Sequence, residues 1–295
     1  MPRLTPAQML YAGALCLWGL MTLLEASYGA LRGRRLYTWQ DTLSNGAMYA
    51  GYAAISFLWV HVMFGLYTFL QAHAVVQIGV GGWHLGQSGL WWEWVVLFLC
   101  EDLCFYAFHR SSHRVRFLWA SHVTHHSSQR FNLSVAFRQT WTPFFAVAFW
   151  LPLPLLGFDP LMVITMQALS LFYQLWLHTE LAPRLGPLEW VFNTPRHHRV
   201  HHGSNPQYVD RNFGGVLIVW DRLFGTFAPL DEPVRYGLHE NLTSSNPAWI
   251  AFHEWVAIGR DLLATGSLAC LLRDVPLDDG GAVSAPRPLE RPVRS

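Results

Sequence analysis

Long apolar runs dominate the sequence and limit most strongly the folds that the chain can adopt. The first extends from about Gln8 to Leu31, the second from about Leu43 to Leu70 and the third from about Leu90 to Phe108. Each reaches the roughly 20 residues that an α-helix needs to cross a bilayer. The segment from Trp141 to Leu177 is also apolar, but three prolines and a glycine interrupt it between residues 152 and 160. This pattern predicts a helical hairpin with a tight turn.

The distribution of arginine orients these predicted spans. Three arginines at 32–35 follow the first span and three at 110–116 follow the third, whereas the loop at 71–87 has none. Because basic residues are enriched in cytoplasmic loops, we expect the N-terminus outside and the hairpin to leave from and return to the cytoplasmic face. The expected fold is an all-α membrane protein with about four to five transmembrane helices and a cytoplasmic helical cap. A bacterial inner membrane is the expected location.

Composition agrees with one membrane-embedded domain of 295 residues, since 52% of the residues are hydrophobic and only 13% are charged. The predicted organisation is N-terminal spans at 1–90, a histidine-rich catalytic region at 91–230, a C-terminal interfacial helix within 231–277 and a disordered tail at 278–295. The formal net charge of +1 gives no reason to expect nucleic acid as a partner.

Histidine spacing is the most informative local pattern. Ten of the 15 histidines lie between residues 109 and 202. They form one HxxxH motif (His109, His113), two HxxHH motifs (His122, His125, His126 and His198, His201, His202), the residue His197 directly before the last motif, and His178 at the end of the hairpin. On a helix, positions i, i+3 and i+4 share one face. Each motif can therefore direct two or three imidazoles at one point.

The number of these imidazoles predicts two metal ions. Neutral imidazole binds Fe, Zn, Cu and Ni, so the ligand type alone does not select the metal. Eight or nine convergent rings exceed what one ion can use. A lone HxxxH is more often two ordinary core or surface histidines, but three motifs in this order after apolar spans disfavour that alternative. Two histidine-bound metals beside a membrane favour oxygen activation at a C–H bond.

Four runs resemble the fatty acid hydroxylase/sterol desaturase superfamily: EDLCFYAFHRSSH, LWASHVTHHSSQRFNLSVAFRQ, QLWLHTE and NTPRHHRVHHGSNPQYVDRNFGGVLIVWDRLFGTF. Within it they are most similar to the alkylglycerol monooxygenase-like bacterial branch. The resemblance covers roughly Trp91 to Pro229, and the first two spans match in hydropathy only. It implies a non-haem di-iron centre, with O₂ as co-substrate and a membrane lipid as substrate.

The resemblance also implies a set of metal ligands. Carried over position by position, they are His109, His113, His122, His125, His126, His178, His198, His201 and His202. Several relatives have a further histidine four residues before the one that matches His178, where this chain has Gln174. Gln174 either orients a water or ligand or leaves one metal with an open position. We expect His197 to support a ligand rather than to bind metal.

Buried carboxylates are the expected partners of the ligating rings. A metal-bound imidazole usually donates its second N–H to a carboxylate or carbonyl, which orients the ring. Asp102, Asp210 and Asp221 are candidates for that role, with ordinary pairing to nearby arginines as the alternative. Asn212 is a candidate hydrogen-bond donor near the site.

The expected activity is O₂-dependent hydroxylation of a lipid C–H bond, in a fatty acyl, sterol or ether lipid. A desaturase with the same site is the first alternative, and a metal-binding or metal-transport membrane protein is the second. Transporters hold their ligands near the bilayer midplane on broken helices, whereas these motifs follow the spans. No flavin, haem or dinucleotide motif is visible. An electron donor is therefore expected: a ferredoxin, a cytochrome b5-like protein, a reductase, or the reduced pterin of the alkylglycerol branch.

Overall fold

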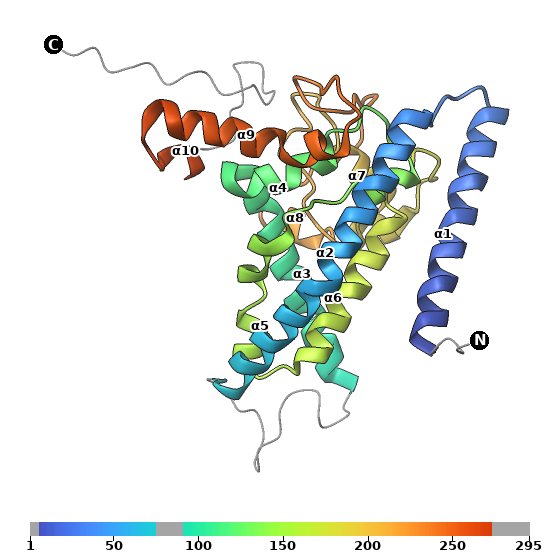
Figure 1. Cartoon of the computed structure of the whole chain (residues 1–295). Coiled ribbons are helices and arrows are strands. Elements are labelled where there is room, and N and C mark those ends of the chain that lie inside the picture. The colour runs from blue at the N-terminus through green and yellow to red at the C-terminus, as the bar shows by residue number, and fades with distance from the viewer. Residues whose placement is uncertain (1–5, 75–90, 273–295) are drawn as a thin grey trace, which may run out of the picture.

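The computed structural model describes residues 6–74 and 91–272, and it is helical throughout (Figure 1). The longer helices are α1 (Pro6–Leu31), α2 (Trp39–Ala72), α3 (Trp91–Arg114), α4 (Arg116–His126), α6 (Pro160–Leu175) and α9 (Pro247–Thr265). Short helices are α5 (Pro152–Leu155), α7 (Pro195–His201), α8 (Val219–Leu223) and α10 (Ala269–Leu272), with 3-10 turns η1 (Leu133–Phe137), η2 (Pro143–Phe149) and η3 (Gly186–Trp190). Within these two ranges strand pairing is limited to isolated bridges.

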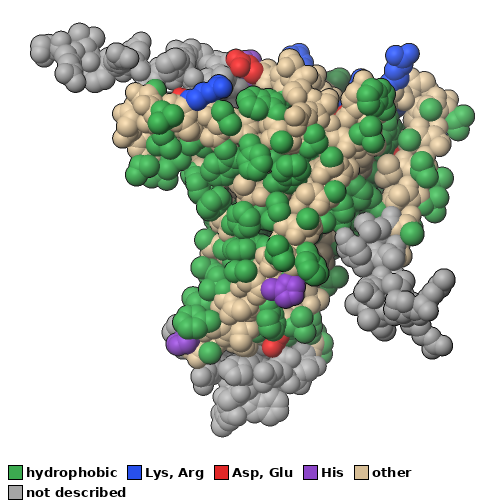
Figure 2. Space-filling model, viewed as in Figure 1, with side chains coloured by type: hydrophobic (Ala, Val, Ile, Leu, Met, Phe, Trp, Pro, Cys, Tyr) green, Lys and Arg blue, Asp and Glu red, His purple; other side chains and the backbone are tan. Residues whose placement is uncertain are grey.

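Helices α2, α3 and α6 pack together as a stem, and α4, α7 and α9 lie at one end of it (Figure 1). Tyr67, Leu97 and Val163 from the three stem helices are fully buried in a shared apolar core. The outside of the stem is also apolar, with Phe57 and Leu58 each 69% exposed. Figure 2 shows hydrophobic side chains over the stem, whereas most of the visible charged side chains gather at the end that carries α9. In a water-soluble helical bundle, by contrast, the exposed side chains are mostly polar.

Helices form at all three predicted spans. In the described part of the chain, α2 alone is both long and apolar enough to cross a membrane, and only 6% of its most apolar window is buried. The structure therefore supports an all-helical chain with one such helix. The count of about four to five spans stays a prediction.

The predicted hairpin at Trp141–Leu177 is correct in its turn and second leg and wrong in its first leg. That leg consists of η2 and the four-residue α5 instead of a continuous α-helix. The prolines at 143, 152 and 154 lack the N–H that an α-helix needs, so the chain adopts tighter turns. Gly157 turns the chain with a φ of 95°, and Asp159 caps α6 by accepting from the N–H groups of Leu161 and Met162 at 2.8 and 3.2 Å.

Helix α9 forms within the predicted C-terminal helical segment and ends at Gly266, whose φ of 65° is the left-handed conformation that stops a helix. One face packs on α4, and Trp249, Phe252 and Val256 form an exposed apolar stripe on another. Its position at a membrane interface stays a prediction. The predicted tail at 278–295 and most of the loop at 71–87 lie outside the described residues.

Arg116 fastens α4 to α9. Its side chain is 1% exposed, its Nε donates to Glu254 Oε1 at 2.7 Å, and its Nη1 donates to Asp261. Burial removes the hydration of the guanidinium, and its two carboxylate partners compensate for that loss. Removing either side would leave a buried charge without a partner. The pairing therefore determines where α9 lies against the histidine-bearing helix.

We expect Arg116→Met to lower the free energy of unfolding by about 3 kcal/mol, the lower end of the range for a broken buried ion pair, because both carboxylates are partly exposed. Denaturant titration of the purified protein in detergent measures this change. Arg260→Met, at an exposed position of α9, is the matched control and should change stability by less than about 0.5 kcal/mol. Equal effects of the two substitutions would contradict the role of Arg116.

Candidate metal centre

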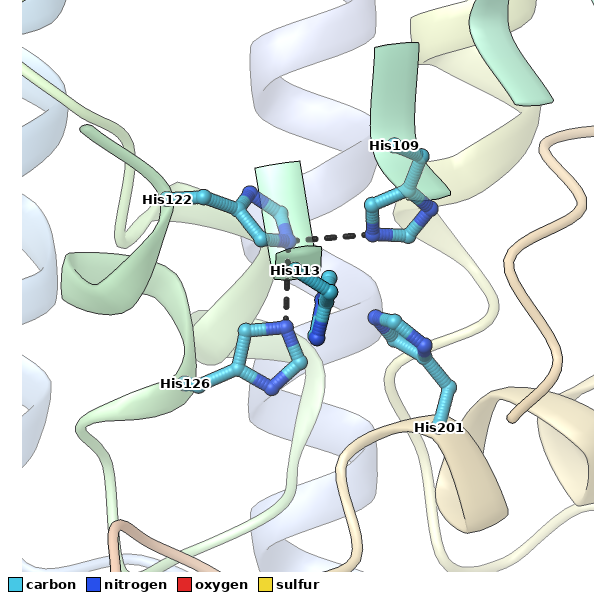
Figure 3. Close-up of side chains that lie close together, drawn as sticks. All are labelled: His109, His113, His122, His126 and His201. Atoms are coloured by element: carbon cyan, nitrogen blue, oxygen red, sulfur yellow. Dashed lines mark hydrogen bonds between the residues drawn. The ribbon is translucent and has the colours of Figure 1, made fainter. Parts of the chain in front are cut away.

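The structure brings all nine predicted ligands together. Within the described ranges they form two groups, one of five rings (His109, His113, His122, His126, His201) and one of four (His125, His178, His198, His202). In each group the candidate ligand atoms all lie within 4.8 Å of one another. Figure 3 shows the five-histidine group, whose rings come from α3, α4 and α7 and converge on one point. Ligands about 2.1 Å from a shared ion lie up to about 4.2 Å apart, so both groups are close to ligating distances.

Each HxxHH motif contributes to both groups. His126 belongs to the five-histidine group and the adjacent His125 to the four-histidine group, and His201 and His202 divide in the same way. The two groups are therefore adjacent, and they meet where the rings of His126 and His202 stack with centroids 4.4 Å apart. Two ions held there would be neighbours in one centre.

Backbone carbonyls orient four of the rings. The Nδ1 atoms lie against carbonyl oxygens in the pairs His109–Phe213 (2.8 Å), His178–Gln174 (3.0 Å), His201–Arg211 (3.0 Å) and His125–Arg138 (3.3 Å). A carbonyl only accepts, so Nδ1 must carry the proton in each of these rings. Their Nε2 atoms then hold the free lone pair that a metal requires.

Burial keeps these imidazoles neutral. It lowers the pKa of His125 to about 4, and it holds the pKa values of His122, His126, His178, His198, His201 and His202 well below the ordinary value. The cause is the loss of hydration around the charged form, and neighbouring histidines add to it in most of these rings. A neutral imidazole is the form that ligates a metal.

The contacts between rings fit a bound cation. His125 Nε2 and His178 Nε2 lie 3.1 Å apart, and both rings carry their proton on the opposite nitrogen. Two lone pairs at that distance repel each other, because neither atom has a proton to donate. A cation between them turns the repulsion into ligation. His113 Nε2 and His201 Nε2 are also buried, with no hydrogen-bond partner among the described residues.

Asp102 and Asp221 contact backbone N–H groups of the loop at 213–217, and no recorded hydrogen bond joins either carboxylate to a ring of the nine candidate ligands. Asp221 accepts from the N–H groups of Phe213 and Gly214 at 2.8 and 2.7 Å, and the Phe213 carbonyl in turn orients His109. Asp102 accepts from the N–H groups of Val216 and Leu217 at 2.8 and 3.1 Å and from the indole of Trp220. Asp102 therefore holds the loop at 213–217 against α3, and Asp221 holds the start of the same loop against α8.

The other predicted supporting residues occupy different places. Asp210 is the predicted carboxylate that faces an imidazole, with Oδ1 3.7 Å from His113 Nδ1, and its Oδ2 pairs with Arg114. The Gln174 side chain points to Ser170 at 3.3 Å, so its backbone carbonyl is the group that reaches His178.

His197 is buried but lies in neither group, and its carbonyl accepts from the Asn212 side chain at 3.1 Å. Asn212 also bonds to the backbone of Ala228 in both directions, at 2.8 Å each. These two residues thus join α7 to the loop that follows it. Neither reaches a ring nitrogen of the nine candidate ligands through a contact that the structure records.

Sequence reasoning missed the residues that enclose the rings. Trp119 packs against His113 and His126 with centroids 5.2 and 5.7 Å apart, and Phe131 packs against His178 and His202 at 5.7 and 5.2 Å. Both aromatic side chains are buried and exclude water from the rings. In a chain rich in aromatic residues, the sequence does not distinguish the aromatic side chains that enclose a site. A backbone carbonyl leaves no mark in the sequence.

We expect Asp221→Asn to destabilise the fold by about 2 kcal/mol, because an amide cannot accept all three hydrogen bonds that the carboxylate receives. The same change should weaken metal binding by about 10-fold through the displaced Phe213 carbonyl. Thermal unfolding and metal titration measure the two effects. Asp231→Asn, at an exposed position, is the control, and equal behaviour of the two variants would refute the role assigned to Asp221.

Residues 94–226, which include both histidine groups, match the fatty acid hydroxylase family. Alkylglycerol monooxygenase from Xenopus tropicalis is 41% identical over 197 residues, which is 66% of this chain and 44% of that protein. Alkylglycerol monooxygenase from Danio rerio is 51% identical over 148 residues, or 50% of this chain and 33% of that protein. An ornithine lipid hydroxylase from Rhizobium tropici is 36% identical over 124 residues, or 41% of this chain and 38% of that protein.

The chain spans less than half the length of each of these relatives. No solved structure matches it. The family match covers the region in which the nine histidines converge, and the names of these relatives agree with it. The region that holds the nine histidines is therefore similar to fatty acid hydroxylases.

Proposed function

We propose that this chain is an integral-membrane, non-haem di-iron monooxygenase that uses O₂ to hydroxylate a C–H bond of a lipid. One observation carries the proposal: four segments of the chain deliver nine imidazoles to two adjacent groups of five and four. That number of nitrogen donors matches two ions. It exceeds the four ligands of a structural zinc site.

The five-histidine group would hold one ion and the four-histidine group the other. Ligand chemistry leaves the metal open among Fe, Zn, Cu and Ni, and the similarity to the fatty acid hydroxylase family favours iron. When bound, a di-iron centre supplies the O₂ activation that an unactivated C–H bond requires. The chain's own contribution is to fix the ring tautomers, exclude water with residues such as Trp119 and Phe131, and position the substrate.

The apolar stem supports a lipid substrate that approaches from the bilayer. The relatives named as alkylglycerol monooxygenase and ornithine lipid hydroxylase act, by their names, on lipids, and both names describe hydroxylation. We therefore favour hydroxylation over desaturation, and we infer that the substrate is a fatty acyl, sterol or ether lipid. Its chain would lie along the stem with the reacting carbon next to the rings.

We infer that the stem crosses the membrane and that the histidine-bearing end faces the cytoplasm. The exposed apolar surface of α2 and the arginines at 32–35 and 110–116 support this orientation. The exposed stripe of Trp249, Phe252 and Val256 would place α9 along the interface. The bacterial inner membrane remains the expected location.

Electrons must come from outside the chain, since its sequence has no flavin, haem or dinucleotide motif. The proposed donor is a ferredoxin, a cytochrome b5-like protein or a reductase, with a reduced pterin as the alternative. Supplying each donor separately to the purified protein distinguishes them by product formation.

Carefully purified protein should contain about two metal ions per chain, mainly iron, by elemental analysis. His125→Ala and His201→Ala should each reduce the metal content and abolish turnover, because each removes a donor from a different group. His61→Ala is the matched control, since that ring is exposed and lies outside both groups. One metal or none in the unmodified protein would contradict the di-metal centre.

Comparing the lipids of cells that express the intact protein with those that express His125→Ala should identify the substrate. Hydroxylation adds 16 Da to a lipid, and growth under ¹⁸O₂ should add two further mass units, because one oxygen atom comes from O₂. A loss of 2 Da would indicate desaturation instead. Metal transport into liposomes without any oxidised lipid would favour the transporter alternative.

A further inference from the structure

The C-terminal turn of α4 separates the two histidine groups. His126 enters the five-histidine group while the residue before it, His125, enters the four-histidine group. Consecutive residues on a helix point about 100° apart, so the position of this one turn determines where both rings lie. Any rotation or fraying of the turn would move a donor of each group at once.

A helix end is ordinarily the least stable part of a helix, because its last carbonyls have no partner within it. Here Arg138 supplies partners on both sides of the histidine pair. Its Nε donates to the carbonyl of Thr124 at 3.1 Å and to the hydroxyl of Ser127 at 2.9 Å. The hydroxyl of Ser127 also donates to the Thr124 carbonyl, at 2.7 Å. The guanidinium therefore clamps the residue before His125 and the residue after His126.

The opposite side of the Arg138 guanidinium is anchored on α2. Its Nη1 donates to Asn45 Oδ1 at 2.8 Å and to Asp41 Oδ1 at 3.3 Å. Asp41 in turn accepts from the Ser128 hydroxyl at 2.9 Å. Among the described helices, α2 is the one long and apolar enough to cross a membrane, so the clamp ties the turn to the stem.

The Arg138 backbone completes the arrangement, since its carbonyl lies 3.3 Å from His125 Nδ1. The side chain is 4% exposed, and its Nε and Nη1 atoms donate to the protein groups named above. A guanidinium has no lone pair to offer a metal. Its contacts are consistent with holding the turn in place.

We propose that Arg138 is a positioning residue that holds the His125–His126 turn so that the two rings serve different metal ions. The proposal rests on the di-metal centre proposed above. It assigns the larger effect to the four-histidine group, because losing His125 leaves that group three donors, whereas losing His126 leaves the other group four. A substitution of Arg138 should therefore weaken metal binding to the four-histidine group more than to the five-histidine group.

Titrating metal-free protein with Co²⁺ tests this directly, because the d–d absorption of Co²⁺ reports each ligated ion without turnover. Arg138→Met should keep the first binding step and weaken the second by at least about 10-fold, the usual effect of losing an outer partner of a ligand. Elemental analysis after dialysis should then give about one metal per chain. Arg138→Lys should be intermediate, since an ammonium retains the charge but cannot span both anchors.

Arg130→Met is the matched control, because Arg130 is exposed in the connection between α4 and η1 and its loss should leave both binding steps unchanged. Two steps of unaltered affinity in Arg138→Met would overturn the proposal. So would a parallel loss of both steps with a large fall in melting temperature, which would indicate a general structural role. If Arg138→Met does not fold, Ser127→Ala and Asp41→Asn provide the test. An unchanged affinity of the second binding step in both variants would overturn the proposal. Absence of two metals in the unmodified protein would instead refute the di-metal centre.

Discussion

The rest of the structure depends on buried, neutral imidazoles that present their lone pairs to one another. His125 Nε2 and His178 Nε2 approach to 3.1 Å with both protons committed to backbone carbonyls, which is unfavourable unless a cation lies between them. Other parts of the fold maintain this arrangement. Asp221 holds the backbone that orients His109, and Phe131 excludes water from the four-histidine group. The chain thus fixes the tautomers and positions of these rings so that their lone pairs could ligate a metal.

The surroundings of the rings suit chemistry that must be kept away from water. The stem core and the two aromatic side chains at 119 and 131 make the site apolar on the sides that the described residues cover. The hydrogen-bonding groups near the rings are mainly backbone carbonyls, which cannot exchange protons. Such surroundings would leave the proposed ions as the reactive element and would limit the protein to orienting groups and excluding water, which agrees with the proposed oxygenase activity.

The spacing of the histidines predicts that they converge. It does not predict how they divide into two groups. The offsets among His122, His125 and His126 place these rings on one side of α4, and all nine candidate ligands do converge. Their division into groups of five and four depends on where α7 lies against α4, which no local pattern encodes. The expectation that carboxylates would contact the rings missed the role of the backbone, since Asp102 and Asp221 reach the loop at 213–217 instead. The first leg of the hairpin was wrong because three prolines outweighed its apolar composition.

The division of adjacent histidines between the two groups has a consequence for how such a sequence can evolve. His125 and His126, like His201 and His202, must keep a one-residue offset to enter different groups. Replacing Val123 or Thr124 by another residue preserves that register, whereas one inserted or deleted residue would rotate every following ring by about 100°. Both groups would lose donors in a single event. Relatives that retain the chemistry should therefore differ freely in the letters between these histidines and very little in their number.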